Sequence, residues 1–451
     1  MKYINLVFAL AVCLFLLSCK KYLDKKPDQE LVIPSTLFDL QALLDNHSNM
    51  ITKGVSWGEA SADNYYISDV VYQTSITESQ ELYTWQLKKY NRYPNDWANL
   101  YIPVYYSNLV LEILPDISKT VINAEAWDNV KGTSLFHRSR SYLHGSFLFA
   151  NAWDNATAAT DYGMVLRNTT DFNLPSVRAS LHETYNQLIA DFKEAATLLP
   201  DNPVHVIRPS KAAAYGYLAR AYLSMRKYDS CFKYANLALQ IKNSLMDYNK
   251  IQVSASSTRT FTRFNEEVVF QSQITFSLPS FSTSRARVDS ILYLSYDAND
   301  LRKKLFFLPQ SDGYRFRGTY DGFNDFFNGL ATDELYLMRA ESRARTGDAN
   351  GAMDDLNTLM VKRWKAGTFI PFVANTPAKA LKIILEERRK ELLFRGLRWM
   401  DIKRLNKEGA DIQLTRKVQG NIFTLAPNDK RYALPLPDDL VTTFGIPQNP
   451  Y

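Results

Sequence analysis

The strongest constraint on the fold of this chain is a helix–turn–helix pattern that occurs twice. Residues 210–239 read SKAAAYGYLARAYLSMRKYDSCFKYANLAL, which predicts two helices joined by a short turn at Arg226–Tyr228. Residues 333–359, DELYLMRAESRARTGDANGAMDDLNTL, repeat the pattern around a turn at Gly347-Asp348. Small residues recur in both copies. Each copy therefore predicts a pair of helices that pack closely along one face.

The spacing Leu218-Ala219-x-x-Tyr222 in the first copy is typical of tetratricopeptide units, in which alanine lets two helices approach. Cys231 falls where that pattern has alanine, so we interpret it as a packing thiol. An insertion (251–330) rich in Ser, Thr, Phe and Arg separates the copies, and its EEVVFQSQITF segment predicts a short strand. The sequence predicts a mainly α fold of tetratricopeptide-like helix-pair repeats with a loop-rich insertion that carries short strands.

A short apolar run at the N-terminus ends at a cysteine. Leu6–Leu17 contains 12 uncharged residues, whereas a membrane-spanning helix needs about 20. A basic start followed by a short apolar centre indicates a secretory signal, and Leu16-Leu17-Ser18-Cys19 resembles a bacterial lipobox. We therefore expect cleavage before Cys19, which then carries diacylglycerol on sulphur and an acyl chain (palmitate) on nitrogen. The alternative is an ordinary signal peptide in which Cys19 is incidental.

Composition limits the possible partners of the mature chain. Removal of residues 1–18 lowers the formal charge from +6 to +5, because Lys2 is the only charged residue removed. The chain has no basic tract of the kind that indicates nucleic-acid binding. Only Cys19 and Cys231 remain, so lipidation of Cys19 leaves no intramolecular disulfide. The aromatic content is unusually high, with 27 Tyr, 25 Phe and 7 Trp residues, some of which belong to the core. Tyr is costly to bury without a partner for its hydroxyl and suits wet binding surfaces, which favours a ligand-binding protein.

The sequence contains no signature of an enzyme. It has no P-loop, G-x-G-x-x-G, G-x-S-x-G, C-x-x-C or H-E-x-x-H motif. His137 and His144 share a predicted helix, but seven residues of helix rise about 10.5 Å, too far for one zinc ion. Adjacent acids such as Asp354-Asp355 are interpreted as helix-surface charge. We therefore predict no catalytic residue, no metal site and no cofactor.

Four stretches of the chain together resemble the SusD/RagB family of outer-membrane nutrient-binding lipoproteins. The first is the lipobox at Cys19. The second and third are the two helix pairs. The fourth is EERRKELLFRGLRWMDIKR (386–404), which lies within a predicted long amphipathic helix with a glycine interruption. The QNPY ending of the chain (448–451) also matches. The matching residues of the family motifs are Arg208, Ser210, Lys211, Ala213, Ala214, Leu218, Ala219, Arg220, Arg339, Ala340, Glu341, Gly347, Asp348, Glu387, Arg388, Glu391, Leu392, Phe394, Gly396, Arg398, Asp401 and Arg404. Arg395 and the lack of a glycine before Tyr451 depart from the family pattern.

The resemblance implies an organisation and a function. It implies a signal peptide (1–18), a lipidated tether and entry (19–45), a SusD-like N-terminal helical region (46–250) and a RagB/SusD C-terminal region (251–451) with the 251–330 insertion. It also implies a lipid-anchored, surface-exposed outer-membrane protein that binds an oligosaccharide without catalysis and delivers it to a SusC-like TonB-dependent transporter. The alternatives are the same lid role for a peptide or another nutrient, a surface glycoside hydrolase, and a purely structural repeat protein.

Two groups of residues are assigned roles on this basis. Five residues of the long helix are expected to form a partly buried structural charge network beside Trp399: Glu387, Arg388, Glu391, Arg398 and Asp401. Sugars need aromatic faces and polar partners, and two loop-like stretches carry that mixture outside helical periodicity. They predict ten ligand-binding residues: Asp63, Asn64, Tyr65, Tyr66, Trp85, Phe281, Arg285, Tyr314, Arg315 and Tyr320. Trp97 fits the repeat pattern and is assigned to the core.

Overall fold

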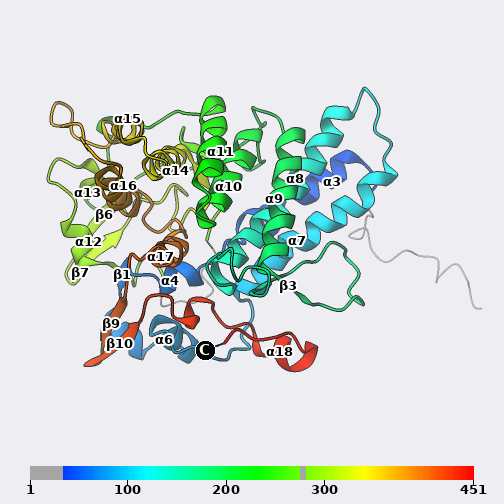
Figure 1. The fold of residues 1–451 in the computed structure, drawn as a ribbon, viewed down its shortest axis with the longest axis horizontal. Helices are drawn as coiled ribbons and strands as arrows, with labels where there is room; N and C mark the ends of the chain where they lie inside the picture. Colours follow the sequence, from blue (N-terminus) through cyan, green and yellow to red (C-terminus); the bar gives the residue numbers. More distant parts are fainter. Residues whose placement is uncertain (1–33, 275–280, 451) are drawn as a thin grey trace, which may run out of the picture.

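The computed structural model describes residues 34–274 and 281–450 and shows a stack of helices with loops along one side (Figure 1). Helices that follow one another along the chain pack side by side, and α11 continues the stack onto α14 across the insertion. The stack consists of α7 (Asp96–Ile113), α8 (Ala124–Phe149), α9 (Leu181–Leu198), α10 (Lys211–Ser224), α11 (Tyr228–Ile241), α14 (Thr332–Arg345), α15 (Ala349–Met360) and α16 (Pro377–Glu391). The fold is mainly α with tetratricopeptide-like helix pairs, as the sequence predicts.

The two predicted helix pairs are α10–α11 and α14–α15. The first pair turns at Arg226, whose φ is 59°. The second turns at Gly347 with φ 98°, a left-handed conformation that glycine adopts without strain. Asp348 then caps α15 by accepting a hydrogen bond from the Gly351 N–H at 2.8 Å. Cys231 is buried between α11 and α14, where its sulphur lies 3.9 Å from the Met338 carbonyl oxygen.

The amphipathic segment predicted as one long helix is two helices. α16 ends at Glu391 and α17 (Arg398–Asn406) begins after a turn of six residues. The chain reverses there because Phe394 and Gly396 both have positive φ, at 58° and 75°. Only the glycine was recognisable in the sequence as an interruption.

Short helices and two-stranded sheets surround this stack, and α4, α6, β9, β10 and α18 lie together on its loop side (Figure 1). Every sheet among the described residues has two antiparallel strands: β1–β5, β2–β3, β4–β8, β6–β7 and β9–β10. The remaining elements are α3 (Leu37–Leu44), η1 (His47–Ile51), α4 (Trp57–Ser61), β1 (Tyr65–Tyr66), α5 (Asp69–Gln73), α6 (Thr77–Tyr83), η2 (Leu114–Asp116), β2 (Tyr162–Val165), β3 (Arg178–Ser180), η3 (Tyr248–Lys250), β4 (Val268–Phe270), β5 (Arg287–Val288), α12 (Ser290–Leu294), α13 (Leu301–Phe306), β6 (Phe307–Gln310), β7 (Gly313–Phe316), β8 (Leu330–Ala331), β9 (Leu414–Val418), β10 (Asn421–Leu425), η4 (Lys430–Tyr432) and α18 (Asp438–Phe444).

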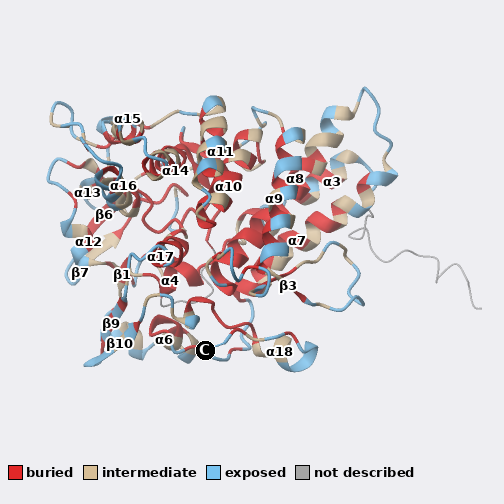
Figure 2. Ribbon diagram, in the orientation of Figure 1, coloured by how far each residue is buried: buried red, intermediate tan, exposed pale blue. Residues whose placement is uncertain are grey.

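The core runs through the whole stack and reaches the loop side. Figure 2 shows buried residues along the inner faces of α8, α10 and α14 and exposed residues at the outer loops. The predicted strand near residue 268 is β4, which pairs with β8 just before α14. Among the described helices, none combines the length and apolarity that a membrane span requires. Cys19 lies outside the described residues.

Candidate functional site

The charged residues of α16 and α17 belong to buried ion-pair clusters. Asp401 accepts hydrogen bonds from Nε of Arg388 at 2.9 Å and from Nε of Arg404 at 2.8 Å. Arg404 also donates two hydrogen bonds to the carboxylate of Glu341 in α14, at 2.6 and 2.8 Å. All four side chains are buried. This cluster fastens α17 and α16 to the second helix pair.

Glu387 and Glu391 form a second cluster with arginines from other segments. Both carboxylates accept hydrogen bonds from Arg302 in α13, and Glu391 accepts another from Arg363 at 2.7 Å. Burial alone would raise the pKa of Glu391, but Arg363 and Arg302 lower it below its ordinary value. Arg363 also pairs with Glu267. The five residues predicted to form one network therefore belong to separate clusters. Most of their ion-pair partners lie outside the helix that was expected to hold the network together.

Five of the ten predicted ligand-binding residues lie in the core: Asn64, Tyr65, Trp85, Phe281 and Tyr320. Their polar atoms have internal partners. The Trp85 indole N–H donates to the Ser61 carbonyl at 3.0 Å, and the Tyr320 hydroxyl donates to Glu267 at 2.9 Å. A ring that is packed on both faces cannot stack on a sugar. These five residues therefore belong to the core on the loop side, whereas the sequence predicted that they would be exposed.

Asp63 is half-buried and its carboxylate is already paired. Arg398 donates to it twice, at 2.7 and 2.8 Å, and Arg389 lies 3.1 Å away. Burial alone would raise the pKa of Asp63, but the two guanidinium groups lower it well below its ordinary value. Asp63 therefore joins the loop before β1 to α16 and α17.

The other four predicted residues, Tyr66, Arg285, Tyr314 and Arg315, are at least partly exposed. Tyr66 lies on β1, Tyr314 and Arg315 lie on β7, and Arg285 lies in the turn before β5. Tyr66 on β1 pairs with Arg287 on β5, and its hydroxyl donates to the Asp312 carbonyl at 2.8 Å. Asp312 lies in the β6–β7 turn, directly before the strand that carries Tyr314 and Arg315. Figure 1 shows β1, β7 and α12 together at one end of the molecule.

Three further residues complete this surface, and sequence reasoning missed them. Tyr293 on α12 stacks on Tyr314, with ring centroids 3.6 Å apart and planes inclined by 16°. Arg287 donates to the Asp312 carboxylate at 2.6 Å. The available signal was the turn Ser311-Asp312-Gly313 between two aromatic segments, which predicts a hairpin. We call Tyr66, Arg285, Arg287, Tyr293, Asp312, Tyr314 and Arg315 the β7 surface.

The β7 surface presents rings, guanidinium groups and a carboxylate side by side. Arg315 donates to Thr283 at 3.1 Å and to Asn324 at 3.3 Å, which holds its guanidinium in place. Such an open surface can stack a flat ring and hydrogen-bond to its edge. It contains no nucleophile paired with a base, and no three acid, His or Cys side chains within the described segments are grouped to hold a metal ion.

The two histidines of α8 are also unsuited to catalysis. His137 and His144 are both buried in the core of the stack. Burial lowers the pKa of each imidazole well below its ordinary value, so both are neutral. His144 Nε2 accepts a hydrogen bond from Arg220 at 3.3 Å and acts within the packing of α8 on α10.

Two family models match separate parts of the chain. Residues 21–223 match a family model described as starch-binding associating with outer membrane, and residues 332–444 match the SusD family model. No curated protein sequence matches the chain.

Several solved structures share the fold. A putative sugar binding protein from Bacteroides vulgatus aligns over 93% of this chain and 99% of its own, with 18% identity and a TM-score of 0.75. A SusD superfamily protein from Bacteroides thetaiotaomicron aligns over 92% and 100%, with 20% identity and a TM-score of 0.74. A SusD-like carbohydrate binding protein from Bacteroides vulgatus aligns over 91% and 97%, with 18% identity and a TM-score of 0.66. At such identities, the likeness concerns the fold.

Proposed function

The chain belongs to the SusD/RagB family, and on that premise we propose that it is a non-enzymatic cell-surface protein that binds a glycan and delivers it to a SusC-like TonB-dependent transporter. The description of one matching family model names starch binding and the outer membrane. Two of the similar solved structures are titled as sugar or carbohydrate binding proteins. The observation that carries the proposal is the β7 surface, which offers the aromatic and polar groups that a sugar requires.

The β7 surface suits a pyranose in two ways. The apolar C–H face of the sugar can lie on a partly exposed ring such as Tyr66, while its hydroxyls face Arg287, Arg315 and Asp312. The strands hold these groups in place before a ligand arrives, which reduces the entropy lost on binding. Because the surface is open, it can accept one stretch of a longer chain whose ends continue into solvent.

Calorimetry with a panel of soluble oligosaccharides tests this assignment. Tyr66→Ala and Tyr314→Ala should each weaken binding at least tenfold, because each removes a stacking surface or its support. Tyr234→Ala, on the partly exposed face of α11, is the matched control and should bind as the wild type does. Unchanged affinity in both variants would show that the glycan does not bind at the β7 surface. Binding of peptides but of no glycan would replace the proposed ligand class by peptide.

We place the protein at the outer membrane through an acylated Cys19. Two or more acyl chains attach a protein stably, whereas a single chain binds only marginally. Cys19→Ser should therefore leave the precursor unprocessed or release the protein from the membrane fraction. Mass spectrometry of the native N-terminus measures the modification directly, and a free Cys19 thiol would contradict this placement.

The transporter partnership rests on the family and on the helix stack, since helix-pair repeats form extended partner-binding surfaces. A gene for a plug-and-barrel transporter should lie beside the gene for this chain, and its product should co-purify in mild detergent. Neighbouring genes for glycosidases would favour a glycan, and neighbouring genes for peptidases would favour a peptide.

A further inference from the structure

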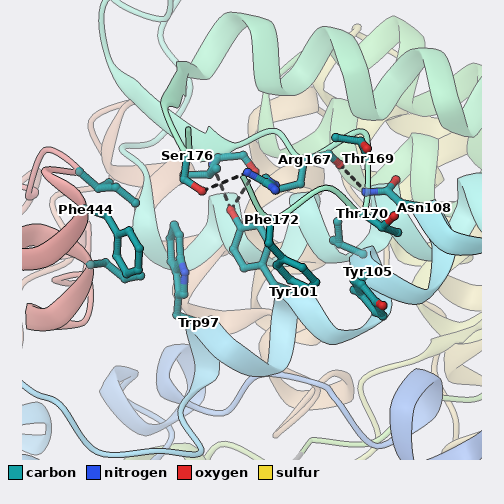
Figure 3. Close-up of a pocket in the computed structure, with 14 residues that line it drawn as sticks. Trp97, Tyr101, Tyr105, Asn108, Arg167, Thr169, Thr170, Phe172, Ser176 and Phe444 are labelled. Atoms are coloured by element: carbon teal, nitrogen blue, oxygen red, sulfur yellow. Dashed lines mark hydrogen bonds between the residues drawn. The ribbon is translucent and has the colours of Figure 1, made fainter. Parts of the chain in front are cut away.

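An aromatic groove lies on the other side of the molecule from the β7 surface. It runs between α7, the loop that joins β2 to β3, and α18, and it has a volume of about 370 Å³. In Figure 3 the rings of Phe444, Trp97, Tyr101 and Tyr105 follow one another along the groove, and polar side chains lie along one edge. Figure 1 places α18 and β7 at opposite ends of the loop side.

The C-terminal segment holds α18 in place beside α7. The buried Asn449 side chain donates to the Phe149 carbonyl at 2.9 Å and to the Leu434 carbonyl at 2.6 Å. It also accepts a hydrogen bond from Arg178 at 2.8 Å. Ile446 anchors the segment in the core. The wall of the groove that carries Phe444 is therefore fixed by hydrogen bonds to the body of the fold.

Folding leaves large rings of this groove in water. Phe172 is 81% exposed and Phe444 is 64% exposed. Phe172 stacks on Tyr105, with centroids 5.6 Å apart and planes inclined by 22°, so the two rings form one continuous surface. Burying apolar surface is favourable. These rings come from three separate segments and converge on one groove, which indicates a ligand that covers them.

The polar edge of the groove is ordered by hydrogen bonds within the protein. Arg167 donates to the Leu174 carbonyl at 2.8 Å, to Ser176 at 3.3 Å and to the Asp171 carbonyl. Thr170 bonds to Glu112 through its backbone N–H and its hydroxyl. Hydroxyl oxygens keep a second acceptor position after one bond is made. The edge can therefore bond to sugar hydroxyls, and neutral acceptors hold the Arg167 guanidinium in place.

We infer that this groove is a second carbohydrate-binding site, which stacks pyranose rings on Tyr105, Phe172 and Phe444 independently of the β7 surface. A pyranose places its C–H face on the rings and its hydroxyls against the polar edge. A purely apolar segment would cover the same rings but would desolvate the edge without replacing its hydrogen bonds to water. The inference rests on the proposed glycan function, and it adds a second point of attachment for one long chain or two short ones.

A groove variant and a matched control test this second site. The double variant Phe172→Ala/Phe444→Ala removes the exposed rings of the groove, and Phe38→Ala on α3 removes a phenylalanine that is also 81% exposed. Neither change should alter the melting temperature, because these side chains contribute little to the core. Calorimetry with the same panel of malto-, cello-, xylo- and manno-oligosaccharides should give two sites per wild-type chain. The groove variant should lose one site or bind at least tenfold more weakly, and Phe38→Ala should match the wild type.

The outcomes distinguish this inference from the proposed function. Loss of one site in the groove variant and of the other in Tyr66→Ala supports both. A groove variant that binds every glycan as the wild type does overturns the groove assignment and leaves the β7 surface intact. If the groove variant instead loses only co-purification of the transporter, the groove is a protein-docking surface and the sugar assignment is wrong. If the wild type binds no glycan at all, both assignments fail.

Discussion

The carboxylate of Asp63 receives two hydrogen bonds from the guanidinium of Arg398, at 2.7 and 2.8 Å. Through this pair the loop before β1 is tied to the first residue of α17, across 335 positions of the chain. Arg389 in α16 adds a contact to the Asp63 carbonyl at 3.0 Å. The same loop continues into Tyr66, so this ion pair positions the strand on which the proposed sugar-stacking ring lies.

Asp63→Ala should therefore lower stability first. Arg398 would be left largely buried without its partner, at a cost of about 3 kcal/mol in the free energy of unfolding. Urea unfolding measures the loss, and Asp354→Ala, which removes an exposed carboxylate of α15, is the control. The double variant Asp63→Ala/Arg398→Ala should recover part of the loss because no unpaired charge remains. Full stability of Asp63→Ala would show that the pair is not structural.

Asp401→Ala should have a larger effect on stability than on ligand affinity. Asp401 accepts hydrogen bonds from two buried arginines, Arg388 and Arg404. Without Asp401, Arg388 loses its carboxylate partner, while Arg404 stays paired with Glu341. The loss should lower the free energy of unfolding by about 3 to 5 kcal/mol. Thermal unfolding and calorimetry on the same preparation separate the two effects. Lost affinity with an unchanged melting temperature would mean that Asp401 belongs to a binding site.

The helix pairs could be predicted because their signal is local. Alternation of small and large residues at helical spacing is visible within 30 residues or so, and it placed the α10–α11 and α14–α15 turns correctly. The break between α16 and α17 was harder, because it depends on a left-handed conformation at Phe394, a residue type with no preference for it.

The site was less predictable because exposure is decided by distant segments. Trp85 and Tyr66 occur in the same aromatic stretch, yet only Trp85 is covered by the core. Similarly, Asp354 and Asp355 look equivalent, but Asp355 is buried against Arg339 at 2.6 Å, so it is not the helix-surface charge that the sequence indicated. The groove was missed because Phe172 and Phe444 lie 272 positions apart.

Trp85→Ala should destabilise the fold more than Tyr66→Ala does. The Trp85 ring is buried, and its indole N–H donates to the Ser61 carbonyl. Truncation leaves a cavity and an unpaired carbonyl, which should cost about 3 to 5 kcal/mol. Tyr66 is partly exposed and its hydroxyl makes one hydrogen bond, to the Asp312 carbonyl, so its truncation should cost only about 1 kcal/mol. Urea unfolding of the two variants side by side tests this, and equal stability of both would place Trp85 at the surface.

Lys403 should make stability depend on pH above neutrality. It lies in α17, is buried, and donates to the Phe147 carbonyl at 2.8 Å and the Ala150 carbonyl at 2.6 Å. Burial lowers its pKa from 10.5 to about 7 in the folded chain. Between these two values the unfolded state binds more protons than the folded state, so stability rises with pH by up to about 1.4 kcal/mol per pH unit.

The comparison with Lys403→Met isolates this contribution, because every other titrating group is common to both proteins. The free energy of unfolding of the wild type, minus that of Lys403→Met, should increase between about pH 7 and pH 10. Lys407→Met removes a half-exposed ammonium beside Asp154 at the end of the same helix, and it should parallel the wild type over this range. Urea unfolding at several pH values gives the three curves. A difference that stays flat, or that falls as the pH rises, would show that Lys403 remains charged in the folded protein.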